Sequence, residues 1–219
     1  MRVPPPLVHL LEAPASSLQC PIFSFPPMTI NGSFITVVSG LPRSGTSMMM
    51  RMIAAGGIPQ LTDGVRAADE DNPLGYAEFE AVKRTKDDAS WLEQAPGKVV
   101  KLVHVLLKDL PDTYPYRVVM MHRDLDEVLA SQGKMLERSG KPGGALPPET
   151  LKKIYTGQMQ GVAAWLASKP NFSVLDVKYN DVLANPATEA GRVAAFLGLE
   201  GKAAEIAAAV EPSLYRNRK

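Results

Sequence analysis

Cysteine is almost missing from this sequence: Cys20 is the single one among 219 residues. One cysteine excludes a disulfide within the chain and a zinc site built on cysteine ligands. The chain also lacks an excess of either charge, since it has 24 Lys and Arg residues and 23 Asp and Glu residues. This balance argues against a protein that coats nucleic acid without sequence preference and against a polybasic membrane anchor. We therefore expect no nucleic-acid partner.

A long unbroken apolar segment is missing as well. The longest stretch without charge, residues 13–42, is interrupted by repeated prolines and several polar residues. A lipid-exposed helix could not hold that pattern. Glu12 and the prolines also spoil the apolar region that a signal peptide needs. We therefore expect no membrane span and, by default, a reducing cytoplasmic location.

Proline content divides the chain into two parts. Residues 1–30 hold seven of the 19 prolines and only two charged residues, Arg2 and Glu12. That composition is typical of an irregular arm. The remaining residues, 31–219, are enough for one compact domain with its own core. We therefore predict a Pro-rich N-terminal arm over 1–30 and one folded domain over 31–219.

Segments typical of buried strands alternate with segments typical of helices along this domain. Runs rich in β-branched residues predict strands at 33–39, 98–105, 117–122 and 172–177. Helix formers with capping or stop signals predict helices at 46–55, 78–95, 124–138, 149–168 and 185–197, and a last short helix that ends near residue 211. The alternation predicts an α/β fold of three layers, with a mainly parallel sheet flanked by helices. In such folds ligands bind at the carboxyl ends of the strands.

The turn between the first strand and the first helix has the composition of a P-loop-like phosphate turn. Residues 40–47, Gly-Leu-Pro-Arg-Ser-Gly-Thr-Ser, nearly match the Walker pattern of Gly, four residues, Gly, Lys and Ser or Thr. Such a turn points backbone N–H groups at an anion, and the dipole of the following helix adds to the attraction. However, Thr46 replaces the Walker lysine, and the basic residue is Arg43, inside the loop. The turn therefore predicts an anion cradle and argues against ATP hydrolysis; an ordinary turn without a ligand is the alternative.

Two further predicted strands are followed by polar residues suited to a nucleotide. Arg123 ends the third strand, and Ser131 lies eight residues later on the next helix. A guanidinium fork and a short hydroxyl are suitable groups for a phosphate. Tyr179 follows the fourth strand. Each residue also has an ordinary interpretation: a surface arginine paired with Asp124 or Asp126, a serine that faces water, and a tyrosine that packs on the core.

These three segments, in this order, resemble the core of bacterial-type, P-loop-related sulfotransferases that use 3′-phosphoadenylyl sulfate (PAPS). The resemblance covers about residues 34–198. It implies that the 5′-phosphosulfate binds to the loop residues Arg43, Ser44, Gly45, Thr46 and Ser47. It also implies that Arg123 and Ser131 grip the 3′-phosphate and that Tyr179 lies near the adenine. The implied cosubstrate is PAPS, the implied product is adenosine 3′,5′-bisphosphate, and no metal is implied.

The resemblance also implies which residues act on the transferring group. Arg43 is implied at the bridging oxygen of the departing phosphate, and Lys101 at the sulfuryl group. His104 is one candidate general base, but it comes one position later than in the family's Lys-Thr-His segment, and such a slip turns a strand side chain to the other face. Glu78 is the second candidate, because residues 72–80 are similar to an Asn-Pro, Gly, acidic segment of bacterial sulfotransferases. We favour Glu78; a core histidine and a solvated glutamate are the ordinary alternatives.

The resemblance implies a transferase that moves a sulfuryl group from PAPS to a hydroxyl or amine, in line and without a metal. The acceptor could be a small molecule, a peptide or a glycan, because acceptor pockets are built by variable loops, here residues 58–77 and 139–148. Two other functions stay open: a P-loop small-molecule kinase that has lost its lysine, and a nucleotide-binding module without sulfotransfer. The family's longer C-terminal Arg-Lys-Gly stretch is absent. The basic tail, residues 215–219, is therefore either a contact to the 3′-phosphate or a frayed end.

Overall fold

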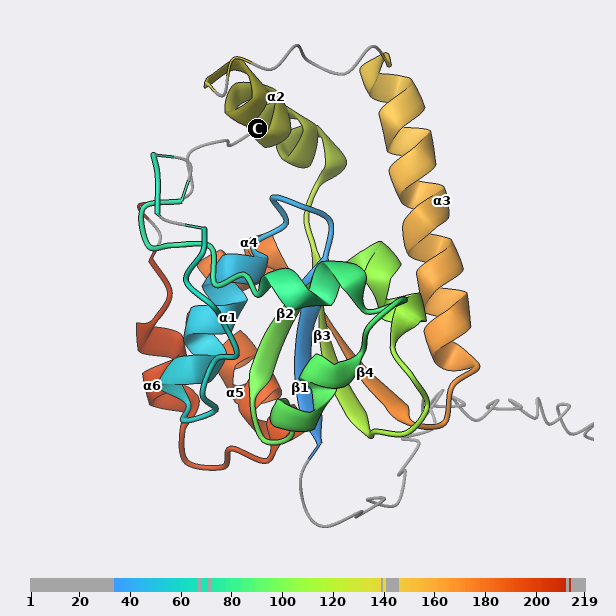
Figure 1. The fold of residues 1–219 in the computed structure, drawn as a ribbon. Helices are drawn as coiled ribbons and strands as arrows, with labels where there is room; N and C mark the ends of the chain where they lie inside the picture. Colours follow the sequence, from blue (N-terminus) through green and yellow to red (C-terminus); the bar gives the residue numbers. More distant parts are fainter. Residues whose placement is uncertain are drawn as a thin grey trace, which may run out of the picture.

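A computed structural model describes residues 34–66, 68–70, 72–138, 140, 146–211 and 213 (Figure 1). The predicted arm over 1–30 and the basic tail over 215–219 lie outside the described residues, as do residues 141–145 of the expected acceptor loop. Within the described part of the chain, no helix combines the length and the apolar character that crossing a bilayer requires.

Four parallel strands form the centre of the domain: β1 (Ile35–Gly40), β2 (Val99–Val103), β3 (Tyr116–His122) and β4 (Phe172–Lys178). They pair in the order β2-β1-β3-β4, and every pairing is parallel. The predicted α/β class and all four predicted strands are confirmed. The register sets Gly40 of β1 level with Val103 of β2 and Met121 of β3. These three strands therefore end together at one edge of the sheet.

Helices cover both faces of this sheet, which gives the predicted three layers (Figure 1). One face carries α1 (Thr46–Ala55), α5 (Pro186–Leu197) and α6 (Ala203–Ala208). The other face carries the 3-10 helices η2 (Ser90–Gln94) and η3 (His104–Asp109), and α3 (Pro148–Ala167). Along β3, Val119 and Met121 join the first core and Val118 and Met120 the second. Because both faces are buried, the strands have continuous apolar runs.

The helix that follows β1 is anchored along its whole length. α1 begins directly after Gly45, which adopts a left-handed conformation (φ 98°), and it ends at Gly56. Its buried side chains are those of Met48, Met49, Met50, Met52 and Ile53. Unbranched methionines adapt to the irregular gaps between the sheet and the neighbouring helices. The N-terminus of α1 is therefore held at the edge where the strands end.

The predicted helix over 78–95 is wrong. This segment forms two 3-10 helices, η1 (Glu80–Arg84) and η2, with a turn between them. Thr85 lies at that turn, and its hydroxyl accepts the indole N–H of Trp91 at 3.0 Å inside the core. Such local side-chain hydrogen bonds compete with a continuous helix. Burial of Trp91 against Thr85 therefore overrides the helix propensity of the segment.

Two short elements were not predicted, and both begin directly after a strand. η3 starts at His104 after β2, and α4 (Tyr179–Ala184) starts at Tyr179 after β4. α2 (Leu125–Arg138) agrees with its prediction. In Figure 1, α2 and the upper part of α3 extend beyond the edge of the sheet at which the strands end. The carboxyl edge is therefore surrounded by helices and connections.

Met52 tests how strongly the core anchors α1. Its side chain is fully buried, so Met52→Ala leaves a cavity and should lower the free energy of unfolding by about 2–5 kcal/mol. Met52→Leu nearly conserves the volume and should cost less than about 1.5 kcal/mol. Urea unfolding followed by circular dichroism measures both. Equal losses for the two variants would contradict a closely packed anchor.

Candidate active site

A cavity of about 370 Å³ opens at the carboxyl edge of the sheet. It is lined by the turn after β1, the start of α1, the connection before η1, the end of β2, and single residues that follow β3 and β4. Crevices outside the carboxyl ends of parallel strands are where α/β proteins bind ligands. The sequence-predicted residues Arg43, Lys101, Glu78, Arg123 and Tyr179 all line this cavity.

The turn after β1 presents the N-terminus of α1 to the cavity. Arg43 has a positive φ of 76°, and Gly45 has a φ of 98°. The N–H of Ser44 donates to the carbonyl of Leu41 at 3.1 Å, which closes the turn. Thr46 and Ser47 line the cavity, and the N–H groups of a first helical turn have no partner within the helix. This geometry suits an anion.

Two positions in this turn have room only for glycine. A Cβ on Gly40 would lie 2.6 Å from the carbonyl oxygen of Met121, and a Cβ on Gly45 would lie 2.4 Å from Cδ2 of Tyr179. The hydroxyl of Ser44 is buried, and no described residue hydrogen-bonds to it. The turn is therefore packed tightly against β3 and α4 on its inner side.

Arg43, Arg123 and Ser131 lie in direct contact although they are far apart in sequence. Nε of Arg43 donates to Oγ of Ser131 at 2.9 Å. Nη1 of Arg123 donates to the backbone carbonyl of Arg43 at 3.1 Å, and its Nε donates to Glu127 at 2.8 Å. The Arg123 side chain is 7% exposed and Ser131 is 2% exposed. The alternatives of a surface arginine and a water-facing serine are therefore wrong.

Tyr179 is both a core residue and a wall of the cavity. It is 6% exposed, packs in the core beside α1 and lines the cavity. The guanidinium carbon of Arg123 lies 4.5 Å from the centre of the Tyr179 ring. Burial raises the pKa of the Tyr179 phenol, and the positive charge of Arg123 opposes that shift. The phenol is thus protonated at neutral pH and can act as a hydrogen-bond donor.

The hydrogen bonds of Lys101 join β2, which carries it, to α1 and to the connection before η1. Its Nζ donates to the backbone carbonyl of Tyr76, to Oγ of Ser47 at 3.4 Å and to Oε1 of Glu78 at 3.4 Å. The side chain is 12% exposed. Burial lowers the pKa of Lys101, and the Glu78 carboxylate opposes this shift. The three hydrogen bonds hold the ammonium group beside the first turn of α1, where Lys101 lines the cavity.

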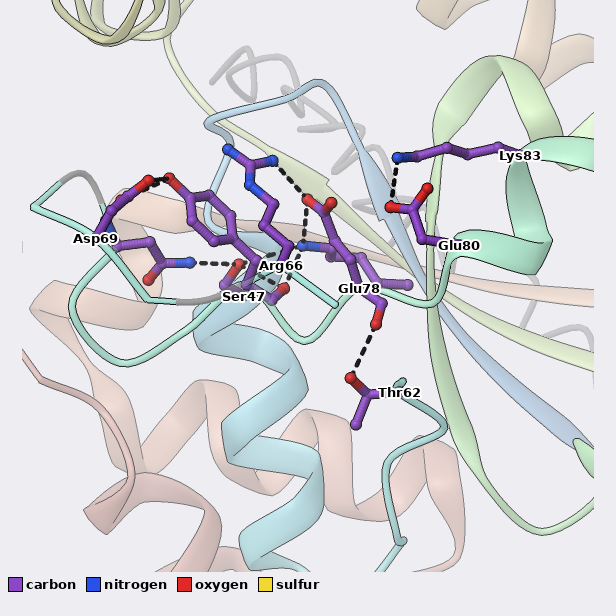
Figure 2. A network of polar contacts seen from close by, with 10 residues as sticks. Ser47, Thr62, Arg66, Asp69, Glu78, Glu80 and Lys83 are labelled. Carbon is purple, nitrogen blue, oxygen red and sulfur yellow. Dashed lines mark hydrogen bonds and ion pairs between the residues drawn. The ribbon is translucent and has the colours of Figure 1, made fainter. Parts of the chain in front are cut away.

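Glu78 lies between two cationic side chains, Arg66, beside which Figure 2 shows it, and Lys101. Its Oε1 accepts from Nη1 of Arg66 at 2.9 Å and from Lys101. The Arg66 guanidinium also stacks on Tyr76, 3.4 Å from the ring centre. Arg66 and Tyr76 were not predicted. Tyr76 lies within residues 72–80, the segment whose similarity to the family predicts Glu78. Arg66 lies in a polar connection that contains no recognisable motif.

His104 is not brought to the cavity. It is 3% exposed, its Nε2 lies 3.1 Å from the side-chain oxygen of Gln158 on α3, and no described residue hydrogen-bonds to its Nδ1. β2 ends at Val103, so His104 is already the first residue of η3. The one-residue offset from the family spacing thus leaves it on the α3 side of the sheet. Of the two candidate bases, Glu78 alone lines the cavity.

The cavity carries a strong positive charge although the whole chain carries a net charge of only +1. Its lining contains one acidic residue, Glu78, and six basic ones: Arg43, Arg51, Arg66, Lys83, Lys101 and Arg123. A recess lined mostly by one sign of charge concentrates ligands of the opposite sign. Among the described residues, no group of three or more His, Cys, Asp or Glu side chains is placed to hold a metal ion. The arrangement therefore suits a highly charged anion.

Comparison with known proteins identifies the family of this chain. Residues 63–203, more than half of the chain, match the model described as the sulfotransferase family. The chain belongs to the sulfotransferase family. The matched range contains Glu78, Lys101, Arg123, Ser131 and Tyr179, whereas the turn over residues 40–47 precedes it.

One solved sulfotransferase shares the fold of this chain at low sequence identity. STF1 from Mycobacterium tuberculosis H37Rv has a TM-score of 0.51 and 16% identity over 80% of this chain and 70% of that chain. The sulfotransferase domain of the curacin biosynthetic pathway has a TM-score of 0.46 and 15% identity over 83% and 88%. No curated protein sequence matches the chain significantly. At this level of identity, the likeness to STF1 shows the fold alone.

Gly45 offers a test of the contact between the turn and α4. Gly45→Ala places a methyl group against the ring of Tyr179 in a left-handed backbone conformation. Gly57 is the matched control, because it also has a positive φ (105°) but no atom within 4 Å of its Cβ position. The left-handed conformation alone should cost each variant about 1–2 kcal/mol. Urea unfolding should show a clearly larger loss for Gly45→Ala, and equal losses would show that the contact with Tyr179 is unimportant.

Proposed function

We propose that this chain transfers a sulfuryl group from PAPS to a hydroxyl or amine of an acceptor, by in-line displacement and without a metal. The observation that carries the proposal is the convergence of Arg43, Arg123 and Ser131 at the N-terminus of α1. Membership of the sulfotransferase family supports the type of transfer. Thr46 in place of the Walker lysine disfavours the alternative of a P-loop kinase.

The chain offers separate groups for the two phosphate ends of this donor. The first-turn N–H groups of α1, with the hydroxyls of Thr46 and Ser47, would hold the 5′-phosphate end. The guanidinium of Arg123 and the hydroxyl of Ser131 would hold the 3′-phosphate. Arg43 belongs to the turn itself and donates to Ser131, so it could contact both ends.

Positive charge would stabilise the departing phosphate as it gains negative charge. When bound, PAPS supplies an activated sulfuryl group whose S–O bond to the 5′-phosphate breaks as the bond to the acceptor forms. Arg43 would stabilise the charge that grows on the bridging oxygen, and Lys101, which donates to Ser47 in the first turn of α1, would contact the transferring group. Both are fixed by hydrogen bonds, so little reorganisation is needed. Adenosine 3′,5′-bisphosphate is the product that leaves.

Glu78 would take the proton of the acceptor. Its carboxylate lines the cavity and lies 3.4 Å from Nζ of Lys101. An acceptor hydroxyl that approaches the sulfuryl group held by Lys101 would therefore also meet Glu78. The wall beside Glu78 is apolar and consists of Phe79, Val82 and Leu106. This end of the cavity suits an acceptor with an apolar body, most simply a small-molecule alcohol or phenol.

Binding without a metal tests the donor assignment. Isothermal titration calorimetry should show that adenosine 3′,5′-bisphosphate binds in the absence of Mg²⁺ and that ATP with Mg²⁺ binds much more weakly. Arg123→Ala should raise the Kd of the bisphosphate at least about tenfold, because a charged hydrogen bond is lost. Arg84→Ala is the control, since Arg84 is exposed and lies outside the cavity lining. Tighter binding of ATP with Mg²⁺ would favour the kinase, and normal affinity in Arg123→Ala would remove its assignment.

A pair of neighbouring glutamates tests the general base. Glu78→Gln should lower kcat about 10²–10⁴-fold, the usual contribution of a positioned base, and should change the Kd of the bisphosphate less than about twofold. Glu80→Gln is the matched control, because Glu80 pairs with Lys83 near the surface and does not line the cavity. Transfer of labelled sulfate to a panel of alcohols and phenols measures turnover. Full activity in Glu78→Gln would show that another group takes the proton.

A further inference from the structure

The turn after β1 has a conformation that its own residues disfavour. The hydrogen bond from the N–H of Ser44 to the carbonyl of Leu41 closes a four-residue β-turn with Pro42 and Arg43 at its centre. Arg43 has a φ of 76°, and a positive φ at the third position, directly after a proline, defines a type II turn. That position favours glycine or asparagine, whereas arginine suits a type I turn. The type II turn therefore depends on interactions from outside the turn.

The two turn types differ in the orientation of the peptide group between Pro42 and Arg43. The ring of Pro42 fixes the φ of that residue, so this peptide group rotates only through the ψ of Pro42 and the φ of Arg43. The carbonyl and the N–H of a trans peptide point in opposite directions. A flip to type I would therefore exchange the places of the Pro42 carbonyl and the Arg43 N–H, while the path of the chain stays nearly the same. A group that binds this carbonyl thus decides the turn type.

Gln132 on α2 binds this carbonyl, and Tyr155 on α3 supports Gln132. Nε2 of Gln132 donates to the carbonyl of Pro42 at 3.1 Å. The hydroxyl of Tyr155 donates to Oε1 of Gln132 at 3.0 Å. Because a backbone carbonyl can only accept, the NH₂ end of the amide must face the turn and its oxygen must face Tyr155. Side chains of two helices thus act together on one peptide group of the turn.

The bound carbonyl points toward a residue outside the cavity lining. Pro42 and Arg43 line the cavity, whereas Gln132 and Tyr155 do not. Since the Pro42 carbonyl is directed at Gln132, the N–H of Arg43 is directed to the opposite side. After a flip, the carbonyl oxygen would take the place of that N–H. Backbone N–H groups of a turn attract an anion, and a carbonyl oxygen in the same place would repel it.

We propose that Gln132 is a positioning residue for the phosphate turn: it keeps the turn in the type II form that binds the 5′-phosphate, and Tyr155 orients its amide. This inference rests on the proposed function, since the anion at the turn is taken as the 5′-phosphate of the donor. Without the hydrogen bond from Gln132, the turn also populates type I, because arginine favours it. The apparent affinity then falls with the fraction of the protein that is ready to bind. Neither Gln132 nor Tyr155 needs to touch the donor.

Two nucleotides isolate the contribution of the 5′-phosphate to binding. Isothermal titration calorimetry on the full chain compares adenosine 3′,5′-bisphosphate with adenosine 3′-monophosphate. In the wild type the 5′-phosphate should improve the affinity at least about tenfold. Gln132→Met loses the hydrogen bond to Pro42, so it should reduce this preference about three- to tenfold and should change the Kd of the monophosphate less than about twofold. Gln160→Met, at an exposed position of α3 outside the cavity lining, should behave like the wild type.

A double variant tests whether Tyr155 acts through Gln132. Tyr155→Phe removes only the hydroxyl, so it should reduce the preference for the bisphosphate less than Gln132→Met does. In the Gln132→Met background, Tyr155→Phe should have no further effect, because the amide that it orients is gone. Tyr114→Phe is the matched control, since Tyr114 lies just before β3, at the opposite edge of the sheet. Additive losses in the double variant would overturn the role of Tyr155.

The two proposals fail in different ways. If the wild type binds neither nucleotide, or binds both equally well, the 5′-phosphate does not bind at the turn. The proposed donor binding is then wrong, and the role of Gln132 falls with it. If the wild type prefers the bisphosphate and Gln132→Met keeps that preference, the role of Gln132 is wrong and the proposed donor stands. Equal weakening of both nucleotides in Gln132→Met indicates a merely structural role and overturns the proposal in the same way.

Discussion

The hydrogen bonds that tie Arg43 to β3 and α2 are the contacts on which the rest of the site depends. Arg123 holds the backbone of Arg43, and Ser131 holds its side chain. The parallel register of β1 and β3 makes this possible, because Gly40 and Met121 lie side by side at the edge of the sheet. These hydrogen bonds hold the turn against the residue that follows β3 and against α2. The N-terminus of α1 is therefore fixed at the edge of the sheet.

Concentrating six cations around one cavity is unfavourable unless they are balanced. Glu127 neutralises Arg123 in the protein interior, and Glu78 neutralises Lys101 and Arg66 at the other end. Buried donors at Ser44 and Arg51 have no acceptor among the described residues. A protein that keeps such groups gives up stability in the ligand-free state, and a ligand that binds only the folded state restores stability.

The predicted and observed elements differ where local and tertiary forces compete. The four strands agree with prediction because runs such as Ile35–Gly40 are β-branched, buried on both faces and followed by glycine or a polar residue. The helix predicted over 78–95 failed because Trp91 turns into the core and hydrogen-bonds to Thr85. The loop residues of the site were predictable from the Walker-like spacing. Arg66, which pairs with Glu78, was not, because no periodicity marks a residue in a long polar connection.

The sequence alone determined the order of the strands along the chain, the glycine-bounded turn and the residue types at the strand ends, since these depend on local spacing and backbone sterics. Only the tertiary structure decided which of those residues meet. It joined Arg43 to Ser131 across 88 positions and brought Glu78, but not His104, to the cavity. The physical reason is that strand register and helix packing, which set these distances, arise from contacts between segments far apart in sequence.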